Sequence, residues 1–168
     1  NCEACMMKGD KVFRVVEKNC YETEDRKQQM EDTKVDIQVL STIPVLFNYW
    51  AKASDGLETS RFFNDHIAET VSRDPHHFIG LGTVPMQDTD LAIREMERCI
   101  KELKMPGLEI GSNINGKNLS DPAFFPFYAA AEKLGVALFI HPWEMMGETQ
   151  MEKYWLPWLV GMPAETAR

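Results

Sequence analysis

The sequence has no long apolar run and no cluster of basic residues. No stretch approaches the roughly 20 consecutive apolar residues of a membrane-spanning helix, and no basic N-terminal segment leads into an apolar run. The net charge of −8, without clustered lysine or arginine, argues against nucleic acid or an anionic membrane as the main partner. We therefore expect a soluble, cytoplasmic protein that binds neither nucleic acid nor a membrane.

Signatures of nucleotide-binding sites and of structural zinc sites are also lacking. No Gly-x-Gly-x-x-Gly follows a predicted strand, and Gly-x-x-x-x-Gly-Lys-Ser/Thr does not occur. Cys2 and Cys5 have the spacing of half a zinc knuckle, but no second pair and no close histidine completes it. Cys99 lies on a predicted helical face, where we expect a reduced, buried thiol.

The composition is that of an ordinary globular protein. With 168 residues, of which 44% are hydrophobic and 26% charged, the chain is long enough for one domain with its own core. It begins with Asn1 and stops at Arg168, inside a predicted helix. We expect it to be a piece of a longer protein.

Strand and helix patterns alternate along the chain, which predicts parallel strands with right-handed crossovers. Four such units fit either an open sheet or half of an eightfold barrel, and the missing nucleotide signatures favour the barrel. A whole barrel takes about 250 residues, so the sequence predicts a partial (β/α)8 TIM barrel over residues 1–168, with a small β insertion at about residues 10–20. The strands are expected at residues 35–42, 78–85, 108–111 and 137–140, and the helices at residues 25–34, 58–74, 89–103 and 122–134, the last with Asp121 as its N-cap.

The run at residues 137–140 is apolar throughout, so it predicts a strand buried on both faces, and it ends on His141. Barrels place their active sites at the carboxyl ends of such strands. An imidazole there can bind a metal or move protons near neutral pH. His141 is therefore a candidate metal ligand, and a structural histidine is the alternative.

The remaining charged candidates are less specific. Arg14 interrupts a β-rich stretch at residues 11–17, where its guanidinium faces either solvent or an anion. The residue by itself favours solvent. We expect His66 on a helix, and His76 and His77 in a solvated loop, all facing away from the site.

Six stretches of the chain resemble the α-amino-β-carboxymuconate-ε-semialdehyde decarboxylase family of the amidohydrolase superfamily. The resemblance extends over nearly the whole chain and implies that residues 1–168 are a fragment of one amidohydrolase-type barrel domain. The long run Lys-Tyr-Trp-Leu-Pro-Trp-Leu-Val-Gly-Met-Pro-Ala-Glu-Thr is the most specific part. The stretches are residues 11–16, 40–45, 80–87, 95–99, 141–143 and 153–166.

This resemblance implies zinc-dependent, non-oxidative decarboxylation of 2-amino-3-carboxymuconate semialdehyde in the kynurenine branch of tryptophan breakdown, which limits quinolinate formation. In the family, Zn2+ is held by a His-x-His pair, a histidine on a middle strand and a final aspartate, and it activates a bound water. His141 matches the middle-strand ligand. No His-x-His occurs here, so we expect that pair, the aspartate and an arginine from the partner subunit of a homodimer to lie outside the chain.

The resemblance also assigns substrate contacts. It places Arg14 against a substrate carboxylate, which reverses the preference for solvent. Trp158 and Met145 match apolar walls of the substrate pocket, with core packing as the alternative for each. Trp143 and Trp155 fit either the pocket or the core.

No catalytic residue is expected within the chain, because the general base is expected C-terminal to Arg168. With one of four zinc ligands and no general base, the isolated chain is expected to be inactive. Two other functions stay open: another metal-dependent hydrolase or decarboxylase of the superfamily, and an inactive truncated form that pairs with intact subunits. Arg14 and the Trp-Leu-Pro-Trp run at residues 155–158 favour the semialdehyde decarboxylase over a generic relative.

Overall fold

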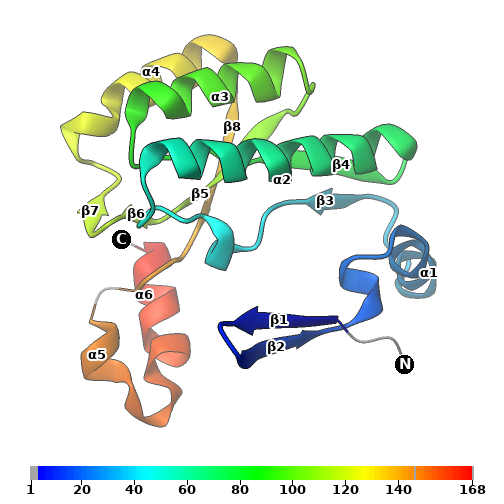
Figure 1. Cartoon of the computed structure of the whole chain (residues 1–168), viewed down its shortest axis with the longest axis horizontal. Coiled ribbons are helices and arrows are strands. Elements are labelled where there is room, and N and C mark those ends of the chain that lie inside the picture. The colour runs from blue at the N-terminus through cyan, green and yellow to red at the C-terminus, as the bar shows by residue number, and fades with distance from the viewer. Residues whose placement is uncertain (1–3, 146, 168) are drawn as a thin grey trace.

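The computed structural model, which describes residues 4–145 and 147–167, contains a curled four-stranded parallel sheet with helices on one face (Figure 1). Each strand is linked to the next by a helix, as the alternating pattern predicts. The chain thus forms a partial (β/α)8 barrel. In spatial order the strands are β3 (Gln38–Leu40), β4 (Phe78–Gly82), β5 (Gly107–Gly111) and β8 (Ala137–His141), and the connecting helices are α2 (Ala53–Arg73), α3 (Thr89–Lys101) and α4 (Phe125–Leu134).

The predicted boundaries agree well for α3, α4, β5 and β8, and less well for β3 and α2. β3 has three residues instead of the eight at 35–42, because it pairs only with β4 and then enters a short 3-10 helix at Pro44–Leu46. A proline has no N–H to donate to a strand ladder. α2 starts at Ala53, before the predicted residue 58, since its first turn is mostly polar and falls outside the apolar pattern.

Two antiparallel hairpins lie outside the parallel sheet. β1 (Ala4–Lys8) pairs with β2 (Lys11–Val16), and only the second of these strands was predicted. β6 (Asn113–Ile114) pairs with β7 (Lys117–Asn118) in a stretch expected to be a polar loop. Asn115 and Gly116 connect them with φ of 51° and 78°, the left-handed conformation that an Asn-Gly pair adopts in tight hairpins.

The rest of the chain forms short helices before and after the barrel strands. In Figure 1 the β1–β2 hairpin and the α5–α6 segment lie on the side of the sheet away from α2, α3 and α4. None of the helices in the described residues has both the length and the apolar composition needed to cross a membrane. The remaining helical elements are η1 (Lys18–Cys20), α1 (Thr23–Thr33), η3 (Pro122–Phe124), α5 (Glu148–Met151), η4 (Lys153–Trp155), η5 (Pro157–Gly161) and α6 (Met162–Ala167).

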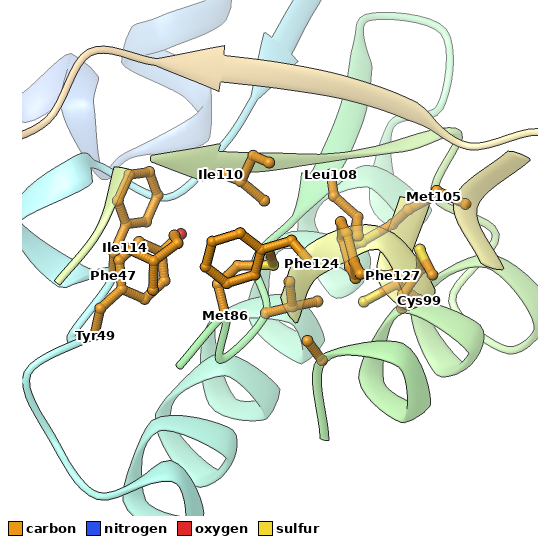
Figure 2. Close-up of a cluster of buried hydrophobic side chains, with 14 of the residues drawn as sticks. Phe47, Tyr49, Met86, Cys99, Met105, Leu108, Ile110, Ile114, Phe124 and Phe127 are labelled. Carbon is orange, nitrogen blue, oxygen red and sulfur yellow. The ribbon is translucent and has the colours of Figure 1, made fainter. Parts of the chain in front are cut away.

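The hydrophobic core lies between the sheet and its helices (Figure 2). Leu108 and Ile110 of β5 pack there with Phe127 of α4 and Cys99 of α3, all fully buried. The approach of α3 to β4 is close: a Cβ added at Gly82 would lie 2.8 Å from the Cys99 sulfur. Burial raises the pKa of the Cys99 thiol to about 12, which agrees with the predicted buried, reduced cysteine.

The opposite, inner face of the sheet is open among the described residues. Phe139 of β8 is 52% exposed and Val39 of β3 is 57% exposed. The prediction that β8 is buried on both faces is therefore wrong for this chain, because β8 is an edge strand that pairs only with β5. The apolar run in β8 is the pattern expected for a strand of a closed barrel, in which both faces of each strand are covered.

A buried polar group fixes the carboxyl end of β4. The Asn64 side chain of α2 accepts a hydrogen bond from the Thr83 N–H at 2.8 Å and donates one to the Thr83 carbonyl at 2.9 Å. Asn64 also donates to Glu95 of α3 at 2.8 Å, and Arg98 pairs with the same carboxylate. These contacts hold α2, α3 and the end of β4 in one arrangement.

Replacing Phe127 by alanine should destabilise the fold far more than the same change at Phe125. Both belong to α4, but Phe127 is 0% exposed in the core and Phe125 is 55% exposed. We expect Phe127→Ala to lower the free energy of unfolding by about 3–5 kcal/mol through lost burial and the cavity left behind. Urea denaturation followed by circular dichroism measures both variants, and equal losses would contradict the described core.

Candidate active site

His141 is the last residue of β8, at the carboxyl end of the sheet, beside Gly111 of β5. Its main-chain carbonyl accepts a hydrogen bond from the Ser112 N–H at 2.9 Å. Its ring Nδ1 lies 2.8 Å from the Pro142 carbonyl oxygen. A carbonyl can only accept, so Nδ1 carries the proton and the neutral ring keeps its lone pair on Nε2. Nε2 is thus the ring nitrogen that carries no proton in this arrangement.

A set of hydrogen bonds holds the chain directly after His141. Trp143 N–H donates to Ser112 Oγ at 3.1 Å, and Asn113 Nδ2 donates to the Trp143 carbonyl at 2.7 Å. Ser112 Oγ in turn donates to Glu165 of α6 at 2.9 Å. Ser112, Asn113 and Glu165 were not recognised from the sequence as site residues, because their contacts join positions far apart in the chain.

Aromatic side chains pack against the same ends of β5 and β8. The Gly111 N–H donates to the buried Tyr49 hydroxyl at 3.1 Å. The Tyr49 ring stacks on Phe47 with 5.3 Å between ring centroids, and Phe47 meets Trp143 edge-on at 6.3 Å. Burial raises the pKa of Tyr49 above its ordinary value. Of the two alternatives for Trp143, pocket or core, these contacts favour packing against the core.

Glu109 is a buried carboxyl on the inner side of the sheet. Leu108 and Ile110 face the helices, and side chains alternate along a strand, so Glu109 faces the same side as His141. It is 2% exposed, and burial raises its pKa, while a hydrogen bond with Ser41 and the charge of His141 act in the opposite direction. Its Oε2 has no hydrogen-bond partner among the described residues.

The predicted substrate residues differ in their surroundings. Met145 is buried, and its Cβ lies 3.4 Å from where a Cβ of Gly161 would be, so it packs on the C-terminal segment. Trp158 of η5 is 51% exposed, which disfavours the alternative of core packing, and Trp155 is more exposed still. Arg14 is exposed on β2, opposite Met6. It forms no ion pair with any residue that the structure describes, and its hairpin is set apart from β8 (Figure 1).

The described residues contain no group of three or more histidine, cysteine, aspartate or glutamate side chains that could hold a metal. His66 lies in α2, while His76 and His77 precede β4 at the opposite end of the strand from the site. His77 Nδ1 pairs with Asp74 at 2.8 Å. Cys2 lies outside the described residues. His141 stays a candidate metal ligand by its position at the carboxyl end of β8.

Comparisons with known proteins identify the family to which the chain belongs. Residues 17–168 match the family described as Amidohydrolase (Amidohydro_2). The chain is 57% identical over 166 residues to a 2-amino-3-carboxymuconate-6-semialdehyde decarboxylase from Dictyostelium discoideum, covering 99% of this chain and 46% of that protein. It is 35% identical over 213 residues to the enzyme of that name from Caenorhabditis elegans, covering 97% and 53%. The chain thus spans about half the length of the curated relatives it matches.

Solved structures show the same fold. The crystal structure of 5-carboxyvanillate decarboxylase from Sphingomonas paucimobilis matches with a TM-score of 0.80 and 35% identity, over 86% of this chain and 44% of that one. A dihydroxybenzoic acid decarboxylase from Polaromonas, solved with bound manganese and an inhibitor, matches with a TM-score of 0.76 and 26% identity, over 86% and 46%. Both matches cover less than half of the solved chain.

Removing the Tyr49 hydroxyl should weaken the strand end. Tyr49→Phe leaves the buried Gly111 N–H without its acceptor, so we expect the free energy of unfolding to fall by about 1–3 kcal/mol. Tyr154→Phe is the matched control, because Tyr154 is 82% exposed. Urea denaturation compares the two variants, and equal stability of Tyr49→Phe and wild type would contradict the contact.

Proposed function

Because the chain belongs to the amidohydrolase family, we propose that the whole protein is a metal-dependent decarboxylase that removes a carboxyl group from 2-amino-3-carboxymuconate 6-semialdehyde. The observation that carries this proposal is the 57% identity over 99% of the chain to the Dictyostelium enzyme of that name. The match to decarboxylase structures supports the reaction class. The reaction would belong to tryptophan breakdown, where it would limit quinolinate formation. The enzyme would act in the cytosol as a homodimer.

His141 would hold the metal through Nε2, the ring nitrogen left without a proton by the Pro142 contact. When bound, the metal supplies Lewis acidity and lowers the pKa of water. The resemblance favours zinc, whereas the Polaromonas decarboxylase structure contains manganese. A catalytic zinc site normally takes three protein ligands, so we propose that a His-x-His pair and an aspartate come from outside residues 1–168, as does the general base.

The chain's own residues would bind and orient the substrate. Arg14 would neutralise a substrate carboxylate, because a guanidinium can pair with both carboxylate oxygens at once. Trp158 and Met145 would form apolar walls beside a flat conjugated acid. The exposed position of Trp158 leaves its ring free for this role.

A second candidate is decarboxylation of an aromatic acid. It is favoured by the structural match to 5-carboxyvanillate decarboxylase, at 35% identity and a TM-score of 0.80. A third candidate is an inactive short form, which is favoured by the lack of any group of three or more possible metal ligands among the described residues.

The deciding experiment is an assay of the whole protein, stripped of metal and reloaded with Zn2+ or Mn2+. The substrates are 2-amino-3-carboxymuconate 6-semialdehyde, 5-carboxyvanillate and 2,6-dihydroxybenzoate. We expect kcat/KM to be highest for the semialdehyde and turnover to require the metal. Faster turnover of either aromatic acid would replace the proposal by the second candidate. Residues 1–168 alone, assayed in parallel, should be inactive.

Replacing His141 by alanine in the whole protein should abolish turnover and weaken metal binding, because a ligand is removed. We expect metal affinity to fall by at least about tenfold. Loss of a group that only orients a metal ligand already costs about that much, and here the ligand itself is lost. His77→Ala is the control, since His77 pairs with Asp74 away from the strand ends. Metal content by mass spectrometry and a metal titration measure both variants. A His141→Ala protein that keeps its metal would exclude His141 as a ligand.

Replacing Arg14 by lysine should raise KM more than it lowers kcat, because a point charge replaces a bidentate contact with the substrate carboxylate. Loss of a hydrogen bond to a charged group corresponds to a rise of roughly tenfold or more. Lys11→Ala, on the same strand, serves as the control. An unchanged KM in the Arg14 variant would mean that the Arg14 side chain faces solvent and does not contact the substrate carboxylate.

A further inference from the structure

Glu165 places a carboxylate in a buried position at the end of the sheet. It is 6% exposed, and its Oε1 accepts hydrogen bonds from Ser112 Oγ at 2.9 Å and from Asn113 Nδ2 at 3.4 Å. Burying a carboxylate is costly unless hydrogen bonds compensate it. The contacts therefore tie α6 to the strand end next to His141.

The carboxylate determines which way the Ser112 hydroxyl points. A hydroxyl has one proton to donate, and an ionised carboxylate can only accept. With its proton given to Glu165, Ser112 Oγ has lone pairs free to accept the Trp143 N–H at 3.1 Å. The other nearby acceptor, the Trp143 carbonyl, is farther away at 3.4 Å and already accepts from Asn113 at 2.7 Å.

The Trp143 N–H and the Pro142 carbonyl belong to one planar peptide unit, so fixing one of them fixes the other. The N–H side is held by Ser112, and the carbonyl side accepts the proton of His141 Nδ1 at 2.8 Å. An unbroken path of hydrogen bonds thus runs from the Glu165 carboxylate through Ser112 and this peptide to the imidazole. That last bond sets the tautomer and the orientation of the ring.

We propose that Glu165 is a positioning residue for His141: through Ser112 and the Pro142–Trp143 peptide it keeps the imidazole with Nε2 ready for a metal. These contacts thereby fix the C-terminal segment that carries Trp158 relative to β8, which carries His141. The inference rests on the proposed function only in that His141 binds a metal.

The test uses the whole protein and four variants. Glu165→Ala and Ser112→Ala break the path, while Glu165→Gln keeps an oxygen that can accept from Ser112. Glu152→Ala removes an exposed carboxylate of the same segment and is the control. Zn2+ titration should show a 10- to 100-fold weaker affinity for the first two variants, the usual cost of losing a group that orients a metal-bound histidine, and a much smaller change for Glu165→Gln and Glu152→Ala.

Coupling between the two positions gives a sharper criterion. If Glu165 acts through Ser112, the double alanine variant should bind Zn2+ no more weakly than Ser112→Ala alone. Additive losses would mean that Glu165 acts by another route, and the proposal would be wrong. It would also be wrong if Glu165→Ala lowered the melting temperature but left Zn2+ affinity unchanged, because Glu165 would then only anchor α6.

A readout without metal or substrate separates this inference from the proposed function. Long-range 1H–15N spectra of the metal-free protein report which nitrogen of His141 is protonated, with the signal assigned by its loss in His141→Gln. We expect the Nδ1-protonated form in wild type and in Glu165→Gln, and a mixture of tautomers in Glu165→Ala. The same tautomer in all three proteins would overturn the inference, whatever substrate the enzyme accepts. A protein that binds Zn2+ but does not turn over the semialdehyde would overturn only the proposed function.

Discussion

Burial of Leu108 and Ile110 against the helices is the constraint on which the site depends. It fixes one face of β5, and because side chains alternate along a strand, Glu109 has to face the inner side. The parallel ladder then brings His141 to the same side and the same end, beside Gly111. A slip of one residue in this register would turn the imidazole toward the helices. The hydrophobic core therefore positions the candidate metal ligand without contacting it.

The parts of the fold that the sequence predicts are those with a clear local period. The helix at residues 89–101 repeats apolar residues at helical spacing, and the parallel strands are short runs rich in apolar residues, of which β8 lies between Gly135 and Pro142. β1 was missed because its pairing with β2 is what makes it a strand, and its residues are mostly exposed. The length of β3 was overestimated, since the pattern does not reveal that it pairs on one side only.

The site residues show the same difference between local signals, which the sequence reveals, and long-range contacts, which it does not. The position of His141 can be predicted, because a histidine at the end of an apolar strand is a local signal, and the structure adds that Nδ1 faces the Pro142 carbonyl. Glu165 cannot, because its partner Ser112 is 53 residues away and nothing near either residue marks the contact. Glu109 stands in a five-residue strand, too short for its alternation to assign it to a face. The assignments of Arg14, Trp158 and Met145 to the substrate rest on family resemblance and stay predictions.

The long separation between Ser112 and Glu165 also bears on the order in which the protein matures during synthesis. Each strand of the sheet pairs with a strand that is close in sequence, so these units can assemble as the chain leaves the ribosome, N-terminal part first. Ser112, which accepts the N–H of the peptide after His141, gains its hydrogen bond to Glu165 only when α6 has emerged and docked. Under the proposed role of Glu165, a nascent chain passes through a stage in which the sheet and its helices are folded but the His141 imidazole is not yet oriented, and tight metal binding would wait for the C-terminal segment.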